Sequence, residues 1–397
     1  MIRKDKKASP DKSILFERPK VRRPKSSFAG KSPNILIGEF GYPQVNVGTL
    51  SSEEYVAQMD TPKNYVDKNV SSKEILFFRQ SLVNSLSKVR VKELQQNYVE
   101  QTQEIAKAKR AVDTQVELDR PLLRRMEFHS RSLPHGPSAS LKKLTITENV
   151  GVAKSIERAT SDTDALATTG LSELYDNSVD AYKLSSLLSA GTLGREGHRK
   201  LVPSKWAITA VDDLLGEGLR KEITEYSSFD FSVFSFEYIG NYYVILCLPG
   251  DWSFELLEYT QEGHFYNKGD GALLTQDHEF VTGRKTYAYE TAGGYYASRL
   301  SVFEFCSRMK RQGRFIVYRV ISKEYDVPLG VWTVRETVRK TLESAPISCE
   351  TRSQAISVVL DELKKTISDF SRRESAQEFV AQSKVLREEQ PTLKNWL

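Results

Sequence analysis

The sequence predicts an α+β protein, because segments of helical composition and segments rich in strand-forming residues follow one another in blocks. Residues 51–118 and 150–190 have helical composition, whereas aromatic and β-branched residues dominate the chain from Trp206 onward. The two kinds of segment are partly segregated, which favours α+β over a regular βαβ succession. Hydrophobic residues make up 39% of the 397 residues, enough to fill a core and to exclude a disordered chain.

The chain is expected to consist of four parts. Residues 1–28 form a flexible basic arm, and residues 29–345 form one large mixed α/β body with a sub-boundary near 195–205. Residues 346–389 form a charged helical extension, and residues 390–397 form a terminal motif.

The basic arm carries most of the positive charge of the protein. Residues 1–28 contain ten Lys and Arg against three acids, a net charge of +7, while the rest of the chain carries −2. A basic arm gains affinity for DNA by releasing the counterions condensed on phosphates. A solvated terminus that only aids solubility explains the same composition, and both interpretations stay open.

In the first half of the body we expect two paired strands and several helices. Residues 34–40 and 44–48 flank a Gly-Tyr-Pro turn and read as paired strands. A helix is expected from Ser72 to about residue 112, and further helices through 150–190.

The second half is expected to be a sheet with one buried helix. Gly240-Asn241 separates two apolar runs and predicts a hairpin, and residues 295–311 show helical periodicity. The expected strands cover residues 206–211, 229–239, 242–248, 252–260, 315–321 and 329–334.

Several classes of protein are disfavoured. The longest apolar run, residues 242–249, is far shorter than the roughly 20 residues of a membrane span, so no membrane association is expected. Cys247, Cys306 and Cys349 are odd in number and far apart, which fits a reducing compartment and predicts a cytoplasmic protein. The five histidines show no HxxxH or HExxH spacing, and there is no GxSxG nucleophile motif.

The last eight residues combine a glutamine with three apolar side chains. In a 3₁₀ turn Leu393 and Trp396 would share one side with Leu397, forming a plug suited to a partner's pocket. The pattern resembles the box by which replication and repair proteins bind the DNA sliding clamp (PCNA). The alternative is a last helical turn packed on the protein's own core. The motif comprises Gln390, Pro391, Thr392, Leu393, Lys394, Asn395, Trp396 and Leu397.

Asp212 and Asp213 are weak candidates for a metal site. Paired acids at the end of a strand can hold Mg²⁺ in phosphoryl-transfer sites. Adjacent strand residues point to opposite faces, however, so we favour a helix N-cap for one of them.

A basic and aromatic segment is the candidate contact with nucleic acid. In a strand, Lys285, Tyr287 and Tyr289 would share one face, where a cation and two rings suit a single strand. Arg284 and Arg299 would add contacts to the phosphate backbone. A half-buried strand with its tyrosines in the core is the alternative.

Four long blocks resemble the Nre family of archaeal DNA-repair proteins. They are SPNILIGEFGYPQVNVG, GREGHRKLVPSKWAITAVDD, GRKTYAYETAGGYYASRLSVFE and EYDVPLGVWTVRE, and QPTLKNWL resembles the family's clamp-binding terminus. The resemblance implies repair of DNA damage in concert with nucleotide excision repair, and binding to the sliding clamp. It implies no catalytic residues. Many members carry an N-terminal cysteine-rich segment resembling a zinc site, but no cysteine precedes Cys247 here, so no cofactor is expected.

The sequence therefore predicts a DNA-binding repair factor that the clamp delivers to DNA. One rival is a metal-dependent nuclease that uses Asp212 or Asp213. The other is a module that binds single-stranded nucleic acid. Convergence of these acids with a third would favour the nuclease, and an open basic groove lined by tyrosines would favour the module.

Overall fold

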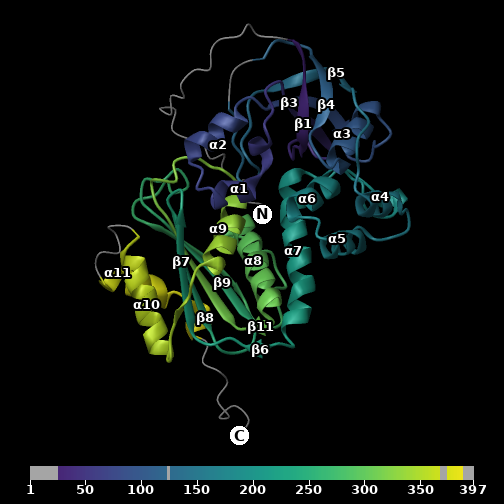
Figure 1. Cartoon of the computed structure of the whole chain (residues 1–397). Coiled ribbons are helices and arrows are strands. Elements are labelled where there is room, and N and C mark those ends of the chain that lie inside the picture. Colours follow the sequence, from purple (N-terminus) through teal and green to yellow (C-terminus); the bar gives the residue numbers. More distant parts are fainter. Residues whose placement is uncertain (1–25, 123–125, 367–372, 388–397) are drawn as a thin grey trace. The chain divides into compact units, whose positions relative to one another are not determined.

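The computed structural model describes residues 26–122, 126–366 and 373–387 (Figure 1). The fold is α+β, as the sequence predicts. The chain divides into two compact units at Leu215/Gly216, inside a helix. The N-terminal unit runs up to Leu215 and includes Pro328–Gly330, and the C-terminal unit comprises Gly216–Val327 and the residues from Val331 onward.

The N-terminal unit contains a closed five-stranded barrel in the order β1-β2-β3-β5-β4. All neighbouring strands are antiparallel except β3 and β5, which are parallel. The strands are β1 Ser27–Ile37, β2 Gln44–Ser52, β3 Val83–Arg90, β4 Val112–Leu118 and β5 Ser138–Ile146. The helices are η1 Ala57–Asp60, α1 Pro62–Asp67, α2 Ser72–Arg79, α3 Asn97–Lys107, α4 Lys154–Ser161, α5 Ala167–Asp176, α6 Ala181–Ser189, η2 Glu196–His198 and α7 Ser204–Ile223.

Alternating apolar residues close this barrel around a buried core. Val45 and Val47 on β2 and Val112 and Val116 on β4 are buried at a spacing that places each pair on one face of its strand. The β1–β2 pair predicted from sequence is present, although β1 begins at Ser27 and so includes the last two residues of the expected arm.

The long helix expected from Ser72 to residue 112 is wrong. The cap of α2 is Ser71, one residue before the Ser72 expected from sequence, and it forms a capping box with Glu74. The helix ends at Arg79. The chain then enters β3, which pairs with β2 and β5. Strand pairing across the barrel outweighs the helical composition of this segment.

Two expected strands are helices. Residues 206–211 belong to α7, where Ala207, Val211 and Leu215 are buried at a spacing of four. Residues 332–334 open α9, in which Val334 and Val338 repeat that spacing. Short apolar runs of this kind fit a buried helix as well as a strand.

The C-terminal unit is built on a mixed six-stranded sheet in the order β10-β9-β12-β8-β7-β13. Only β9 and β12 run parallel among its neighbours. Its strands are β7 Ser232–Tyr238, β8 Asn241–Leu248, β9 Ser253–Thr260, β10 Leu273–Glu279, β12 Arg314–Ile321 and β13 Ile347–Ser348, and β6 Ser227–Ser228 pairs separately with β11 Arg311–Gln312. The helices are α8 Ala292–Met309, α9 Trp332–Glu343, α10 Arg352–Lys364, α11 Arg373–Ala381 and α12 Lys384–Arg387.

The predicted β7–β8 hairpin is present, with its turn one residue earlier than the sequence suggests. Ile239 and Gly240 are the central residues and both have positive φ, at 49° and 66°, the pattern of a type I′ turn. A Cβ at Gly240 would lie 2.5 Å from the Tyr325 nitrogen, so glycine is required there.

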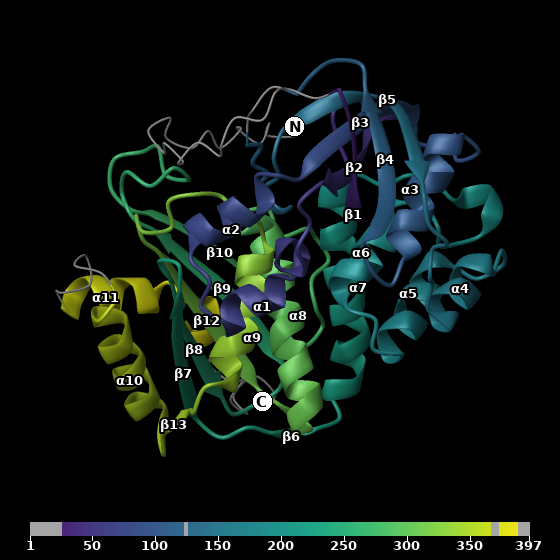
Figure 2. The ribbon, with the colours of Figure 1, turned by 45° about the horizontal axis from the view of Figure 1, so that its top comes forward.

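Helices cover both faces of this sheet, as the two views of the ribbon show (Figures 1 and 2). Val359 and Leu363 of α10 and Phe379 of α11 join β8 and β12 in one core. On the other face lie α8 and α9, where Trp252 stacks on Phe303 with ring centroids 4.1 Å apart. Cys247, Cys306 and Cys349 are all buried and free. No helix among the described residues is long and apolar enough to span a membrane.

Candidate nucleic-acid interface of the C-terminal unit

The basic and aromatic segment singled out from sequence is a loop and not a strand. Residues 280–291 connect β10 to α8 without regular secondary structure, which corrects the expected strand. Lys285 is exposed, Tyr287 is partly buried, and Tyr289 is 79% exposed, the highest value among the large hydrophobic side chains described. Lys285 and Tyr289 are therefore on the surface, as a nucleic-acid contact requires.

A buried carboxylate at the end of β10 fixes the shape of this loop. Asp277 accepts hydrogen bonds from the backbone nitrogens of Glu290 and Thr291, at 3.0 and 2.8 Å, and from the Thr291 hydroxyl at 3.0 Å. Its other oxygen accepts the Arg284 guanidinium at 3.0 Å. Both ends of the loop are thus tied to one side chain, and charge-assisted bonds of this kind are stronger than neutral ones.

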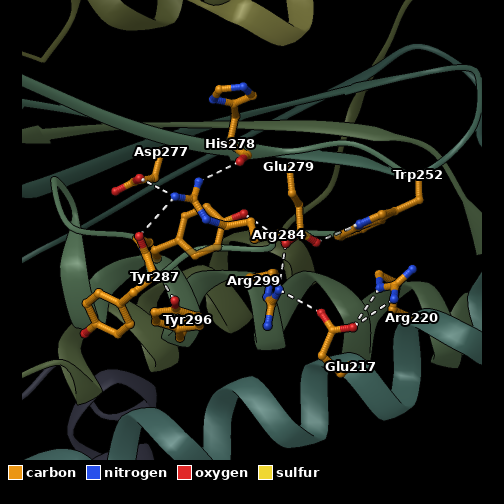
Figure 3. A network of polar contacts seen from close by, with 12 residues as sticks. Glu217, Arg220, Trp252, Asp277, His278, Glu279, Arg284, Tyr287, Tyr296 and Arg299 are labelled. Carbon is orange, nitrogen blue, oxygen red and sulfur yellow. Dashed lines mark hydrogen bonds and ion pairs between the residues drawn. The ribbon is translucent and has the colours of Figure 1, made fainter. Parts of the chain in front are cut away.

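The guanidinium of Arg284 is bound to groups of the loop and of β10. It also donates to the carbonyl oxygen of His278 at 2.7 Å (Figure 3). It donates to the carbonyl oxygen of Thr286 at 3.1 Å as well. Its face lies 5.1 Å from the ring centroid of Tyr295. Arg284 therefore holds the loop together, and the expected contact with a phosphate is reassigned to a structural role.

Arg299 lies deeper, in a buried network that supports the loop from below (Figure 3). Its guanidinium donates to Glu279 at 2.6 Å and to Glu217 at 3.1 Å, and its side chain is 1% exposed. Arg299 cannot present its charge to DNA from this position, so its expected role as a backbone contact is corrected.

Glu279 is fully enclosed and accepts three hydrogen bonds. Besides Arg299, the indole nitrogen of Trp252 donates at 2.9 Å and the hydroxyl of Tyr295 at 3.1 Å. Burial, together with the nearby Glu279 charge, raises the pKa of Tyr295 well above its ordinary value, so this hydroxyl stays protonated as a donor. Asp277 and Glu279 are two residues apart on β10, and this spacing places them on one face.

The network extends to the last turns of α7. Glu217 accepts both Nε and a terminal nitrogen of Arg220, at 3.0 and 2.9 Å. Arg220 in turn donates to the backbone oxygen of Val281, at the start of the loop, at 2.9 Å. The loop is therefore bound to α7 as well as to β10.

Three tyrosine rings give the loop an aromatic surface. The ring of Tyr287 lies 5.1 Å from that of Tyr289 and 5.2 Å from that of Tyr296. The Tyr296 hydroxyl accepts a hydrogen bond from the Ala288 nitrogen at 3.0 Å, which anchors this group of rings to α8. A fixed, partly exposed pair of rings beside a lysine can stack on an unpaired base and neutralise its phosphate.

The metal site suggested for Asp212 and Asp213 is not formed. Both lie in the middle of α7, so neither caps a helix, and Asp212 is completely buried. Neither belongs to a group of three metal-ligating side chains within the part of the chain that the structure describes. The terminal motif, 390–397, lies outside the described residues.

Sequence reasoning found the exposed surface of this site and missed its support. The supporting residues stand in three different segments, because Glu217 lies on α7, Trp252 directly precedes β9, and Asp277 and Glu279 lie on β10, and no local pattern links the three. Two acids spaced by two residues near the end of a strand were the one available signal.

Comparisons with known proteins identify the family. Residues 12–267 match the model of the archaeal Nre N-terminal region, and residues 279–388 match that of the archaeal Nre C-terminal region. The chain belongs to the archaeal Nre family. The Nre N-terminal match ends before β10, and the C-terminal match begins at Glu279, so the loop 280–291 and its support from α8 lie in the second region.

Named relatives in the Nre family cover most of the chain. DNA repair protein NreA of Haloferax volcanii is 34% identical over 359 residues, which are 88% of this chain and 86% of the relative. DNA repair protein NreA of Archaeoglobus fulgidus is 33% identical and covers 82% of each chain. DNA repair protein NreB of the same organism is 33% identical over 86% of each. No solved structure matches the chain.

Proposed function

We propose that this Nre protein is a cytoplasmic DNA repair factor that the sliding clamp (PCNA) delivers to DNA, acting together with nucleotide excision repair. Its relatives carry the name DNA repair protein. The observation that carries the clamp proposal is the terminal pattern of Gln390 followed by Leu393, Trp396 and Leu397. In a 3₁₀ turn, three apolar side chains at this spacing would form a compact anchor for one hydrophobic pocket.

The chain just before the motif is firmly attached to the C-terminal unit. The Glu255 carboxylate on β9 accepts the Ser383 hydroxyl and the backbone nitrogens of Lys384 and Val385, at 3.0 and 3.2 Å for the two nitrogens. Val385 and Leu386 are buried in the core beneath β9. These contacts hold the chain up to α12, which ends at Arg387, three residues before the motif begins. A truncated protein that ends at residue 389 keeps all of them.

Glu255 has a structural role, which bears on the rival proposal of an enzyme. Burial raises the pKa of its carboxyl, and the hydrogen bonds from Ser383 and the backbone oppose that rise. A raised pKa marks a catalytic acid only when the group faces a cleft. Glu255 faces the start of α12 instead.

The clamp proposal is tested by measuring clamp affinity for variants of the motif. Trp396 has the largest apolar area of the three anchors, so Trp396→Ala should cost about 2–4 kcal/mol, roughly a 30- to 1000-fold loss of affinity. Deleting 390–397 should abolish binding and leave the melting temperature almost unchanged. Lys394→Ala is the matched control, because Lys394 lies in the same segment outside the apolar triad.

A second variant separates docking from folding. Glu255→Gln weakens the attachment of α12 and should lower the melting temperature, while clamp affinity at low temperature stays near that of the unaltered protein. A truncated protein that melts at a markedly lower temperature would show that the motif packs on its own core. Unchanged clamp binding after truncation would place the docking surface elsewhere.

The loop 280–291 supports contact with DNA as the second part of this function. Its exposed Tyr289 and Lys285 provide a stacking surface and a positive charge, and the hydrogen bonds of Asp277 with Arg284 and Glu290 hold the loop in place. This arrangement favours a surface that binds single-stranded DNA over a nuclease site, because Asp212 and Asp213 converge with no third acid in the described chain.

A further inference from the structure

A second cluster of polar side chains lies in the N-terminal unit, in the connection between β4 and β5. The chain there folds back on itself. The Glu127 nitrogen donates to the His135 oxygen at 2.8 Å, and the His135 nitrogen donates to the Glu127 oxygen at 3.1 Å. Residues that exchange both backbone bonds stand directly opposite each other, with their side chains on the same face.

This reversal brings three potential metal ligands together. His129 follows Glu127 by two residues, the spacing that returns a side chain to the same face of an extended segment. One ligand atom from each of Glu127, His129 and His135 lies within 4.8 Å of the other two. Within the described residues, no other group of three His, Cys, Asp or Glu side chains comes this close.

His135 is held in the orientation that a metal ligand needs. Its Nδ1 lies 2.8 Å from the Gly136 carbonyl oxygen, which can only accept, so Nδ1 carries a proton. In the neutral ring Nε2 then has a bare lone pair. A backbone carbonyl bound to the far nitrogen is the usual outer support of a metal-binding histidine. Burial lowers the pKa of both His129 and His135, which disfavours the charged ring that could not bind a metal.

The separation of the two rings fits one shared ion. The Nε2 atoms of His129 and His135 are 3.1 Å apart. Two imidazole nitrogens at about 2.0–2.1 Å from a tetrahedral zinc ion would be roughly 3.3 Å apart. An ion placed between them replaces this hydrogen bond, so His129 must carry its proton on Nδ1 instead of Nε2. The side chains themselves need to move only slightly.

The surrounding charges allow a cation here. Arg79 approaches the histidines, but its guanidinium donates to the backbone oxygens of Met59 and Pro134 and to the Asp60 carboxylate at 3.2 Å. The Asp60 carboxylate offsets part of this charge, and the rest adds to the effect of burial, which lowers the pKa of both histidines. The negative charges of Glu127 and Glu39 act in the opposite direction at His129.

The amide of Asn84 also borders the site. Its Nδ2 lies 3.5 Å from His135 Nε2, too far for a strong hydrogen bond. Its buried Oδ1 has no hydrogen-bond partner among the described residues, so turning the amide toward a metal-bound water sacrifices no bond at that atom.

We propose that Glu127, His129 and His135 bind a single Zn²⁺ ion or a chemically similar divalent transition metal, with one coordination position open to water. Two imidazoles and one carboxylate suit Zn²⁺, whereas Mg²⁺ and Ca²⁺ prefer all-oxygen sites. Three protein ligands leave the fourth tetrahedral position to solvent. The site shares no residue with the clamp motif or with the loop 280–291. Its test is therefore separate from the tests of the proposed function.

The test is a titration of the full chain, freed of metal by a chelator, with Zn²⁺ at neutral pH. Calorimetry should show one ion per chain, and Co²⁺ in place of Zn²⁺ should give the visible absorption bands of a four-coordinate ion. Zn²⁺ should also raise the melting temperature, because a ligand that binds only the folded state stabilises it.

Variants decide whether these three residues form the site. His129→Ala should lower the affinity for Zn²⁺ at least about 100-fold and remove both the Co²⁺ bands and the thermal shift. Glu127→Gln should weaken binding while keeping the size of the side chain. His198→Ala is the matched control, since His198 is an exposed histidine of the same unit and its loss should change nothing.

His135 is buried, so His135→Ala can unfold the unit. The half-buried His129 is the safer position to change, and the Zn²⁺ affinity of the His129→Ala protein is the deciding measurement. The unaltered chain failing to bind Zn²⁺ stoichiometrically would overturn the proposal and leave a simple hydrogen bond between two neutral histidines. Equal binding by a folded His129→Ala protein would overturn it as well.

Discussion

Replacing Arg299 by methionine tests the buried network under the loop 280–291. The substitution keeps a long side chain but removes the charge that faces Glu279 and Glu217. Among the described residues, the Trp252 indole and the Tyr295 hydroxyl are then the donors left to this buried carboxylate. Glu217 is less affected, because Arg220 remains bound to it.

The expected cost follows from the burial of both partners. The side chains of Arg299 and Glu279 are 1% and 0% exposed, so little water can replace the lost partner. Breaking a buried pair on one side costs about 3–5 kcal/mol. For a unit of this size each kcal/mol lowers the melting temperature by roughly 2–4 °C, so a fall of about 6–20 °C is expected.

The assay is urea unfolding of four proteins: the unaltered chain, Arg299→Met, Glu279→Gln and the double variant. If the ion pair with Glu279 is the main interaction of Arg299, then Arg299→Met should lower the free energy of unfolding much less in the Glu279→Gln background than in the unaltered chain. The coupling free energy between the two substitutions should be about 1–3 kcal/mol. Glu217→Gln is the control, because Glu217 is partly exposed and its loss should cost under about 1 kcal/mol.

Two outcomes would refute this reasoning. One is an Arg299→Met protein that loses less than about 1 kcal/mol, which would mean that the pair is solvated or rearranges. The other is an equal cost in both backgrounds, which would show that Arg299 acts through its packing on Tyr295 and Tyr296 and not through its charge.

Three further predictions concern DNA binding and pH. Tyr289→Ala should cost about 1–3 kcal/mol of affinity for single-stranded DNA without changing the melting temperature, and unchanged affinity in a binding titration would rule out stacking there. Deleting residues 2–25 should weaken DNA binding and flatten its dependence on salt, whereas an unaltered salt slope would show that the arm does not contact phosphates. Burial lowers the pKa of His264 to about 4, and its neutral ring donates a hydrogen bond to the Tyr325 oxygen and accepts one from the Tyr266 nitrogen. Its contribution to the free energy of unfolding is therefore complete above about pH 6.5 and is lost as the pH falls from there toward 4. The loss amounts to about 3 kcal/mol at most. Urea unfolding over that range should show a shallower pH dependence for His264→Asn, and parallel curves would contradict the assignment.

Local signals that act within a few residues were readable from the sequence. The hairpin around Gly240 and the strands β8, β9 and β12 follow from short-range chemistry, and the structure contains all of them. The start of α2 was placed correctly to within one residue, because its cap is Ser71 and not Ser72. Apolar runs that fit two structures were misread. Residues 206–211 were expected as a strand, yet Ala207 and Val211 lie on the buried face of helix α7. A short apolar run fits both the helical and the strand periodicity, and only long-range packing decides between them.

The functional surfaces divide in the same way. The sequence by itself determined the family resemblance, the terminal motif and the presence of Lys285, Tyr287 and Tyr289, since these patterns are contiguous. It could not tell that Arg284 and Arg299 are bound internally, because their partners come from segments far away in the chain.

The histidine cluster shows most clearly what tertiary structure alone decided. A search for HxxxH spacing assumes a helix, where ligands four residues apart share a face. Glu127, His129 and His135 meet because two extended segments pair and place residues eight apart directly opposite each other. A contact across a chain reversal depends on the pairing register, which the surrounding fold imposes and which no fixed spacing in the sequence encodes.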